Sequence, residues 1–269
     1  MNICVCIKQV PDTNEIKVDP VTHTLVRKGV PSIVNPFDTY AQEVGVRLKE
    51  KLGGKVVVIS MGPEQAKEAI KTCLSVGADA GYLISSRKFG GSDTLATSYI
   101  LSEAIKAVEE KEGLKFDLIL CGKQAVDGDT AQVGPQIAEH LGLPVISYAQ
   151  DIKVEGDKVI VQRQYDDRYH VVEAQMPCLI TALSELNKPR YMTPGGIFDA
   201  CKAEITTWGR ADLKDVDDSN LGLKGSPTKI AKASDKVRKG AGEKIVPDSP
   251  EDGAAYIVAK FKEKAHHLI

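Results

Sequence analysis

The sequence predicts an α/β fold, in which a doubly wound, mostly parallel sheet carries an antiparallel extension and a C-terminal arm. Up to about residue 148, short apolar runs alternate with segments whose apolar residues recur at helical spacing, as in a parallel sheet joined by helices. Beyond this point, two strand-like runs flank Glu155-Gly156-Asp157, which is a hairpin signal. From Trp208 to Pro250 the chain is charged and glycine-rich without a core pattern, as in a flexible tail or an arm packed on another chain.

The first part of the chain contains five expected strands that single helices connect. The first helix has the clearest start: Asn35 can cap it, Pro36 suits its first position, and Asp38 stands where a capping-box acid would stand. Two glycines, at 53 and 54, end this helix. The strands are expected at 3–7, 55–60, 82–84, 116–121 and 145–148, and later helices at Pro63, at Thr94 to about Glu110, and at Val133 to Leu141.

After residue 148 the remaining strands indicate an antiparallel addition to the sheet rather than another strand–helix unit. The lone Trp208 favours an anchored arm over a flexible tail. We therefore divide the chain into a nucleotide-binding α/β domain at 1–190 and a partner-recognition loop with a C-terminal arm at 191–269. Further expected elements are a hairpin near 18–25 in a polar stretch at 12–34, strands at 153–154, 158–162, 169–173 and 178–182, and helices at 197–202 and 253–264, the last with Ala254, Ile257, Val258 and Phe261 on one side.

The composition indicates a globular protein with a sizeable core, since the chain has 269 residues, a formal net charge of -2 and 42% hydrophobic residues. This charge balance does not suggest a nucleic-acid partner, and no apolar run approaches the roughly 18 residues that span a membrane. The N-terminus lacks a signal-peptide pattern. Because the six cysteines contain no Cys-x-x-Cys pair, we expect buried reduced thiols in a cytoplasmic protein, not disulfides or a metal site.

The most informative segment is the polar, glycine-punctuated loop at 122–134, between a buried strand and the start of a helix. In doubly wound sheets ligands bind beyond the carboxyl ends of the strands, where the N–H groups of a first helical turn suit phosphate oxygens. Because carboxylates repel phosphates, we assign Asp127 and Asp129 hydrogen bonds to ribose hydroxyls or to the backbone; alternatively, Asp129 is only an N-cap. If the first and fourth strands are neighbours, residues 6–10 face this loop across a crevice.

A second glycine-rich segment, Phe89-Gly-Gly-Ser-Asp-Thr94, is similar to the phosphate loop of ATP-pyrophosphate-cleaving enzymes. It follows the third strand rather than the first, which argues against an ATP-cleaving site. Two interpretations of this segment stay open: Ser92 and Thr94 contact a phosphate at a helix start, or the segment is only a capping turn. The sequence has no Ser–His–Asp, Cys–His, Walker or HExxH pattern, so a bound redox cofactor best explains a nucleotide site without catalytic side chains.

Three separated motifs occur in a fixed order: Val34-Asn-Pro-Phe-Asp38, residues 122–134, and Leu186-Asn-Lys-Pro-Arg-Tyr191. Together they resemble the β subunit of an electron transfer flavoprotein over nearly the whole chain, most weakly at 210–250. The resemblance implies an adenine-nucleotide α-hydrolase-like fold and a heterodimer with an FAD-bearing α subunit, onto which the C-terminal arm reaches. Residues 164–170 depart from the glycine-rich acidic stretch usual in the family, so a partner contact there stays open.

The resemblance also implies the cofactor site. One branch of the family holds AMP in the β subunit and another holds a second FAD, and residues 92–98 are similar to the flavin-holding branch. We therefore favour FAD, with AMP as the alternative. The implied contacts are Cys6, Asn35, Pro36, Phe37, Asp38, Met61, Ser92, Asp93, Thr94, Thr97, Gly122, Lys123, Gln124, Ala125, Val126, Asp127, Gly128, Asp129, Thr130, Ala131, Gln132, Val133 and Gly134.

In the flavin-holding branch, NADH gives hydride to the FAD of the β subunit. One electron then passes through the α-subunit flavin to an acyl-CoA dehydrogenase and the other to ferredoxin or flavodoxin. Tyr191, Met192, Ile197 and Phe198 match the place where the family presents a recognition loop to the dehydrogenase; alternatively this is a plain connecting loop. The other functions left open are an AMP-binding structural subunit and a nucleotide-hydrolysing enzyme of the same fold.

Overall fold

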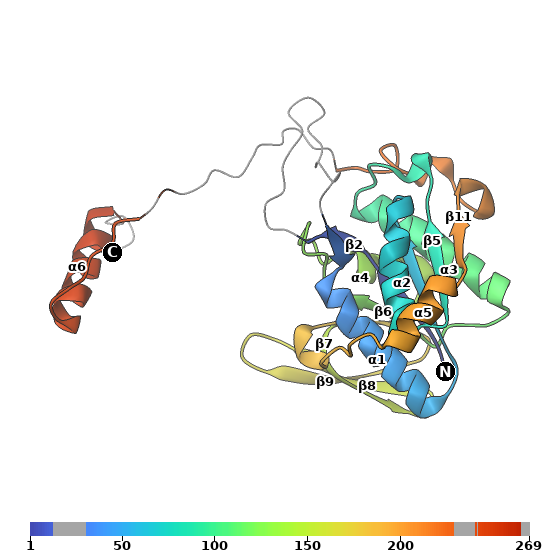
Figure 1. Ribbon diagram of the computed structural model, residues 1–269, viewed down its shortest axis with the longest axis horizontal. Helices are drawn as coiled ribbons and strands as arrows, with labels where there is room; N and C mark the ends of the chain where they lie inside the picture. The colour runs from blue at the N-terminus through green and yellow to red at the C-terminus, as the bar shows by residue number, and fades with distance from the viewer. Residues whose placement is uncertain (13–30, 229–239, 241, 265–269) are drawn as a thin grey trace.

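The computed structural model describes residues 1–12, 31–228, 240 and 242–264, and its centre is a nine-stranded sheet (Figure 1). In the strand order given at the end of this paragraph, the first seven strands pair with their neighbours in parallel, and the last two strands pair antiparallel. This confirms the predicted α/β class. Across the sheet the order is β11 (Ile205–Trp208), β5 (Ala80–Ile84), β4 (Lys55–Met61), β1 (Asn2–Ile7), β6 (Leu118–Gly122), β10 (Cys178–Ala182), β7 (Val145–Glu155), β8 (Lys158–Gln164) and β9 (Tyr169–Gln175).

Helices cover both faces of the sheet, as a doubly wound fold requires. The apolar side chains of α1 (Pro36–Leu52) and α2 (Lys67–Ser75) belong to the core on one face. Those of α3 (Thr94–Glu112) and α4 (Val133–Leu141) belong to the core on the other face. A fifth helix, α5 (Pro194–Lys202), packs on α2. Short 3-10 turns lie at η1 (Glu64–Ala66), η2 (Arg87–Phe89), η3 (Ser184–Leu186), η4 (Arg210–Asp212) and η5 (Asp218–Asn220).

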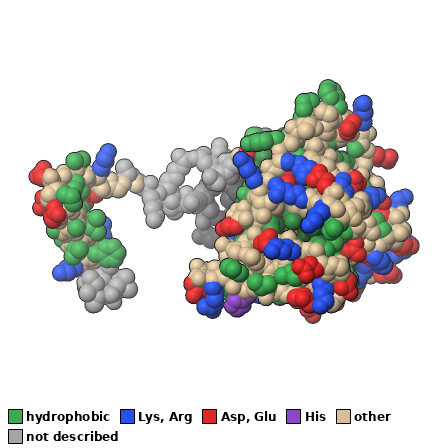
Figure 2. Space-filling view, turned by 90° about the horizontal axis from the view of Figure 1, so that it is seen from below, with side chains coloured by type: hydrophobic (Ala, Val, Ile, Leu, Met, Phe, Trp, Pro, Cys, Tyr) green, Lys and Arg blue, Asp and Glu red, His purple; other side chains and the backbone are tan. Residues whose placement is uncertain are grey.

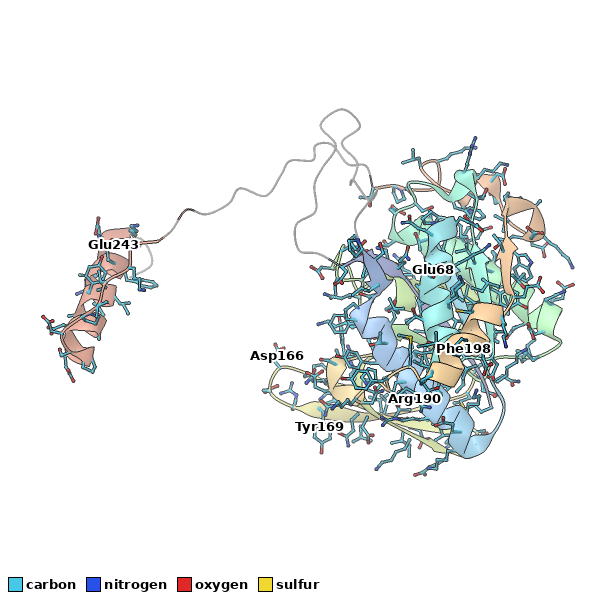
Figure 3. All side chains as sticks on the ribbon, in the orientation of Figure 1. Glu68, Asp166, Tyr169, Arg190, Phe198 and Glu243 are labelled. Atoms are coloured by element: carbon cyan, nitrogen blue, oxygen red, sulfur yellow. The ribbon has the colours of Figure 1, made fainter. Side chains whose placement is uncertain are left out.

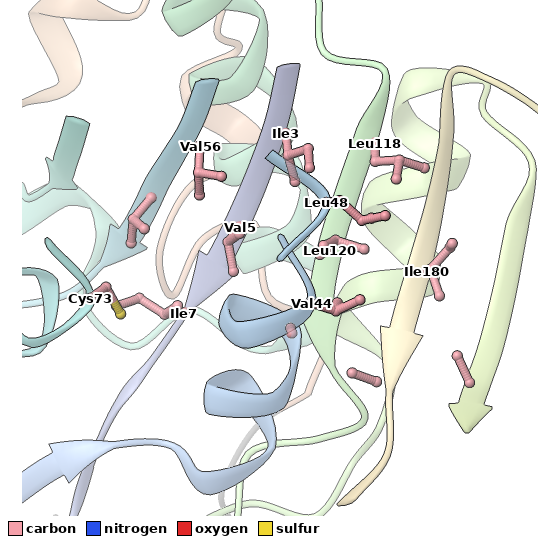
Figure 4. Close-up of a cluster of buried hydrophobic side chains, with 14 of the residues drawn as sticks. Ile3, Val5, Ile7, Val44, Leu48, Val56, Cys73, Leu118, Leu120 and Ile180 are labelled. Atoms are coloured by element: carbon pink, nitrogen blue, oxygen red, sulfur yellow. The ribbon is translucent and has the colours of Figure 1, made fainter. Parts of the chain in front are cut away.

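The central strands are mostly apolar because both of their faces are covered. On the face of α1, Leu120 and Ile180 are fully buried beside Val44 and Leu48 of the helix (Figure 4). On the opposite face the same strands bury Cys4, Cys6, Cys121 and Leu179. Alternate residues of one strand thus supply two separate cores.

The placement of β10 corrects our sequence prediction. We expected residues 178–182 to join the antiparallel addition, but they form a parallel strand between β6 and β7. All five residues of β10 are buried, which suits a central strand. The runs expected at 145–148 and 153–154 are one strand, β7, which is parallel to β10 at its start and antiparallel to β8 beyond it. Two short strands that we did not predict, β2 (Gln9–Pro11) and β3 (Ser32–Val34), pair with each other.

The segment after Lys202 is also better packed than its composition predicts. The strand β11 extends the sheet beside β5, and the ring of Trp208 lies 4.8 Å from that of Tyr82. Leu213, Val216 and Leu221 are buried in the core, so our expectation of no core pattern after Trp208 is wrong for this part. Isolated apolar residues between short 3-10 turns have no regular period, and sequence periodicity therefore misses them.

The predicted final helix is confirmed as α6 (Pro250–Lys264), and none of its residues is buried. The hairpin expected near 18–25 lies outside the described residues, and the division at 190 and 191 stays a prediction. Five of the six cysteines are buried, as expected, whereas Cys201 is exposed. Among the helices of the described ranges, none has the length and apolarity that crossing a bilayer requires.

The buried position of Ile180 gives a test of this core. Ile180→Ala should lower the free energy of unfolding by about 2–5 kcal/mol because it leaves a cavity between β6 and β7. The matched control is Ile257→Ala on α6, where the side chain is 61% exposed and the loss should stay below about 0.5 kcal/mol in the isolated chain. Urea denaturation measures both; equal losses would contradict the placement of β10.

Candidate functional site

A crevice of about 290 Å³ lies beyond the carboxyl ends of β1, β4 and β6. It is where doubly wound sheets bind their ligands, at the point where the strand connections reverse direction. The loops after these strands and the starts of α3 and α4 form its walls. Residues expected to contact a nucleotide that line this crevice are Cys6, Asn35, Asp38, Met61, Ser92, Asp93, Thr94, Thr97, Gly122, Lys123, Gln124, Ala125, Gly128, Thr130, Ala131, Gln132, Val133 and Gly134.

Five expected contact residues do not line the crevice: Pro36, Phe37, Val126, Asp127 and Asp129. Each of them lies close in sequence to residues that do line it. The ring of Phe37 also lies 5.9 Å from the Lys123 ammonium nitrogen. Their role as direct nucleotide contacts stays a prediction.

Ile7 and Lys8, which belong to the range 6–10 expected to face the loop, also line the crevice. Leu101 and Cys121 line it as well, and we did not predict them. Cys121 pairs in register with Cys6. That pairing depends on which strands are neighbours and has no local signal in the sequence.

The buried carboxylate of Asp38 braces the crevice. Its Oδ2 accepts the backbone N–H of Lys8 at 2.7 Å, and its Oδ1 accepts the N–H of Gly122 at 3.1 Å and the Asn35 amide at 2.9 Å. The carboxylate therefore joins the start of α1 to the ends of β1 and β6. Burial raises the pKa of Asp38 to about 7, although these three hydrogen bonds favour its charged form.

The side chain of Asn35 does not cap α1, which corrects our sequence prediction. Its Nδ2 donates to the carbonyl oxygen of Gln124 at 2.8 Å, and its Oδ1 accepts the N–H of Val126 at 3.0 Å. Asp38 likewise serves the brace and forms no capping box. The Asn35 amide thereby ties the start of α1 to the loop after β6.

The loop at 128–134 has the backbone shape of an anion site. Asp129 and Ala131 both have φ of 52°, a left-handed conformation that non-glycine residues seldom adopt. Left-handed residues alternating with other conformations turn successive N–H groups toward one side, which makes a concavity for an anion. The N-cap of α4 is Gln132, whose side chain makes no capping bond, so the first-turn N–H groups stay available to a ligand.

The two carboxylates of this loop bind side chains rather than the backbone. Asp127 forms an ion pair with Lys8 at 2.6 Å, and Asp129 accepts a hydrogen bond from the Gln124 amide at 2.6 Å. The alternative that Asp129 is an N-cap is wrong, because the helix begins four residues later. The pairing of Asp127 with Lys8 links the loop to the end of β1 and withdraws one negative charge from the crevice.

The start of α3 faces the start of α4 across the crevice. The Thr94 hydroxyl donates to Gln132 Oε1 at 2.9 Å, which ties the two helix starts together. Asp93 caps α3 by accepting the N–H of Ala96 at 3.1 Å, and its other oxygen accepts the N–H of Thr228 at 3.0 Å. The capping turn that we left open is therefore present. A phosphate contact by Thr94 stays a prediction.

Two glycines allow the close packing around the crevice. A Cβ on Gly122 would lie 2.6 Å from the carbonyl carbon of Phe37 and 2.7 Å from the backbone nitrogen of Asp38, closer than Cβ atoms approach. A Cβ on Gly134 would lie 2.9 Å from the methyl group of Thr181. The α1 start and the α4 start can therefore approach the strands only where a side chain is missing.

The chemistry of the crevice fits an anionic nucleotide. The start of α4 and the concave loop offer N–H donors, and Lys123 adds positive charge at the rim, whereas Lys8 is paired with Asp127. In the described part of the chain, no group of three or more His, Cys, Asp or Glu side chains could hold a metal ion. These features support binding and orientation of a phosphate-bearing group.

The residues expected to contact a partner form a second exposed region. Tyr191 is 89% and Phe198 is 69% exposed, and Met192 and Ile197 are about half exposed. Ile197 and Phe198 lie on α5, which confirms the helix expected at 197–202 but begins at Pro194. Thr193 caps this helix by accepting the N–H of Gly196 at 3.1 Å.

An ion-pair network anchors this region to α1 through Arg190, which Figure 3 labels. Arg190 pairs with Glu43 at 3.0 Å and with Glu50 at 2.5 Å. Although burial opposes it, hydrogen bonds from Arg190 and Arg47 hold the pKa of Glu43 below its usual value. Because Glu43 is 3% exposed, its charge requires both arginines as partners. The segment that begins at Arg190 is therefore held against α1.

The raised pKa of Asp38 predicts a pH dependence of stability. The pKa rises from 3.8 to about 7 in the folded chain, so the stability it contributes is complete below pH 3.8 and is lost as the pH rises through about 7. Asp38→Asn should remove this decline in urea midpoint. In the control Asp117→Asn, which replaces the carboxylate that accepts the N–H of Asn2 at 2.7 Å, the decline should persist. If the urea midpoint of Asp38→Asn falls with rising pH as much as that of the unmodified chain, Asp38 is not the group responsible for the pH dependence.

Comparison with known proteins identifies the family. The electron transfer flavoprotein domain matches residues 22–213, which is more than half of the chain. The chain is 52% identical over 269 residues to the electron transfer flavoprotein subunit beta of Clostridium acetobutylicum, and the match covers 100% of both chains.

Two further relatives are named as subunits of reductase systems. The caffeyl-CoA reductase-Etf complex subunit CarD of Acetobacterium woodii is 50% identical over 270 residues, with 100% of both chains covered. The acryloyl-CoA reductase electron transfer subunit gamma of Anaerotignum propionicum is 46% identical over 248 residues, which cover 90% of this chain and 91% of the relative. With its α/β fold and nucleotide-type crevice, the chain belongs to the electron transfer flavoprotein family, as one of its β subunits.

Proposed function

We propose that this β subunit binds FAD and, with an α subunit, takes hydride from NADH and divides the electrons between an acyl-CoA dehydrogenase and ferredoxin or flavodoxin. Bound FAD supplies the redox chemistry, since it accepts hydride and releases electrons singly. The observation that carries the proposal is the crevice between the starts of α3 and α4, which suits a diphosphate. The chain itself holds and orients the cofactor.

The diphosphate of FAD has donors on both sides of the crevice. The concave loop at 128–134 and the first turn of α4 offer backbone N–H groups on one side. On the other side, the start of α3 offers the hydroxyls of Thr94 and Thr97, because Asp93 already accepts the N–H of Ala96. A single AMP phosphate needs only the α4 side of the crevice, and the hydroxyls on the α3 side therefore favour the larger cofactor.

The size of the crevice limits which part of FAD it takes. A volume of about 290 Å³ is at the lower end for ligand sites, so it accommodates the adenine nucleotide and leaves the flavin ring outside. A second cleft of about 590 Å³ adjoins the crevice at Met61 and includes Ser86 and Phe89. We place the ring on this side of the crevice.

The same volume favours the alternative function, in which the subunit holds AMP as a structural nucleotide. An AMP-sized ligand would fill the crevice and leave the adjoining cleft to solvent. The nucleotide-hydrolysing alternative has no such support, because the relatives reported above are named as electron transfer or reductase-complex subunits.

The exposed apolar face of α6 supports a partner subunit. Ile257, Val258 and Phe261 are each more than half exposed, and Figure 2 shows apolar side chains gathered on this helix. Such a row is costly in water unless another surface covers it. We assign it to the α subunit, which would bury the row.

We assign docking of the dehydrogenase to residues 191–198. The apolar side chains of this segment are exposed, and Arg190 anchors its start to α1. Phe198 and Tyr191 are large exposed side chains of the kind that dominates binding energy at interfaces. The names of the two reductase-system relatives suggest an enzyme that acts on CoA esters as the partner. Docking of this class of enzyme on α5 is the second part of the proposal.

The cofactor proposal predicts two FAD in each heterodimer. Thr97→Val removes a hydroxyl that lines the crevice and should reduce the FAD content from two toward one. The matched control is Ser98→Ala, whose hydroxyl instead donates to the carbonyl oxygen of Leu95 at 2.8 Å and lies outside the crevice lining. Acid extraction followed by chromatography counts the nucleotides. One FAD and one AMP in the unmodified heterodimer would establish the AMP alternative instead.

The docking proposal predicts a separation of two electron-transfer steps. Ile197→Ala with Phe198→Ala should raise the KM for the dehydrogenase about tenfold or more, as loss of an interface hot spot does. Reduction by NADH should stay near normal because α5 does not line the nucleotide crevice. Stopped-flow measurement of both steps compares this variant with Leu52→Ala, which removes a 45% exposed side chain at the end of α1. Equal loss in both steps would show that the pair only supports packing.

A further inference from the structure

Three thiols form a row at the floor of the nucleotide crevice. Cys4 and Cys6 point to the same face of β1, and Cys121 of β6 is the register partner of Cys6. Cys6 and Cys121 retain 7% and 6% exposure and line the crevice, whereas Cys4 is fully enclosed. The proposed binding of a nucleotide does not by itself explain why two adjacent thiols face the ligand space.

We propose that Cys6 and Cys121 are an oxidation site, at which a hydroperoxide converts the two thiols to an intramolecular disulfide when the crevice is empty. Neighbouring strands lie about 4.8 Å apart, within the Cα separation of about 4.4–6.8 Å that a disulfide accepts. Register partners on parallel strands also direct their Cβ atoms to the same face, so the bond forms without sliding of the strands.

The competing pair, Cys4 with Cys6, is less suited to cross-linking. Residues two apart in a strand have Cα atoms about 6.6 Å apart, near the upper limit for a disulfide. Cys4 also has no exposure through which an oxidant could reach it. The cross-strand pair is therefore the one that the geometry selects.

The hydrogen bonds within the row give the two thiols different roles. Hydrogen bonds from Cys121 and Cys4 lower the pKa of Cys6, although burial opposes this effect. The hydrogen bond to Cys6, together with burial, raises the pKa of Cys121. Because the thiolate is the nucleophile, Cys6 attacks the peroxide first and Cys121 then resolves the sulfenic acid.

The reaction balances with hydrogen peroxide as the oxidant. The Cys6 sulfur takes one peroxide oxygen to give a sulfenic acid, and the first water leaves. The Cys121 sulfur then attacks the Cys6 sulfur, the S–O bond breaks, and the hydroxyl leaves with the Cys121 proton as a second water. The two thiols lose two electrons and two protons in total, and one peroxide becomes two waters.

A bound nucleotide should protect the pair, because the same crevice is the entry route for peroxide and the binding place for the ligand. The test uses the full-length chain with Cys201→Ser, which removes the exposed thiol and prevents cross-links between chains. Nucleotide-free chain is treated with hydrogen peroxide, with and without saturating AMP, then alkylated and digested without reductant. Mass spectrometry should find Cys6 linked to Cys121, with formation about tenfold slower in AMP and full reversal by dithiothreitol.

Variants distinguish this site from general thiol oxidation. Cys121→Ser should abolish the cross-link and leave Cys6 to over-oxidise to a sulfinic acid that dithiothreitol does not reverse. Cys73→Ser, which replaces a buried thiol of α2 outside the crevice, should leave the cross-link unchanged. Cross-linking to Cys4, equal rates with and without AMP, or no cross-link in the parent chain would overturn the proposal. The AMP comparison in the parent chain requires no variant of the pair, so it holds even if Cys121→Ser fails to fold.

Discussion

The buried carboxylate of Asp38 is the interaction on which the crevice depends. It gathers N–H donors from Lys8, Gly122 and Asn35, which belong to three elements far apart in the sequence. Each donor would otherwise be a polar group at a buried strand or helix end, and each unsatisfied group of this kind costs about 1–3 kcal/mol. The ends of β1 and β6 therefore stay at a fixed distance from α1, and the loop after β6 starts from a fixed point.

The shape of the anion site follows from this brace. Asn35 holds the loop at Gln124 and Val126, so the residues beyond it must turn back within a short length of chain. They do so through left-handed backbone at Asp129 and Ala131, a conformation that is unfavourable for non-glycine residues. The hydrogen bonds of the brace and the Lys8–Asp127 ion pair offset this strain. A site held in this way needs little reorganisation when an anion binds.

A single helix, α1, connects the nucleotide crevice with the proposed docking region. Its first turn carries the brace, and Glu43 and Glu50, seven residues apart and therefore on one face, hold Arg190. Asn187 adds a hydrogen bond to the carbonyl oxygen of Tyr40 at 2.9 Å. The segment before α5 is therefore fixed to the same helix that carries the Asp38 brace.

The sequence by itself determined the alternation of strands and helices up to β7, the start of α1 and the location of the crevice. These depend on local periodicity and on the rule that loops after parallel strands meet at one edge of the sheet. Only the tertiary structure decided that Cys178–Ala182 enters the sheet between β6 and β7, since a short, mostly apolar run fits a central strand of either direction. It also decided the partners of Asp38 and the pairing of Cys6 with Cys121. Apart from the bond between Asn35 and Asp38, those contacts join residues 30 or more positions apart along the chain, and no local pattern records which strand lies beside which.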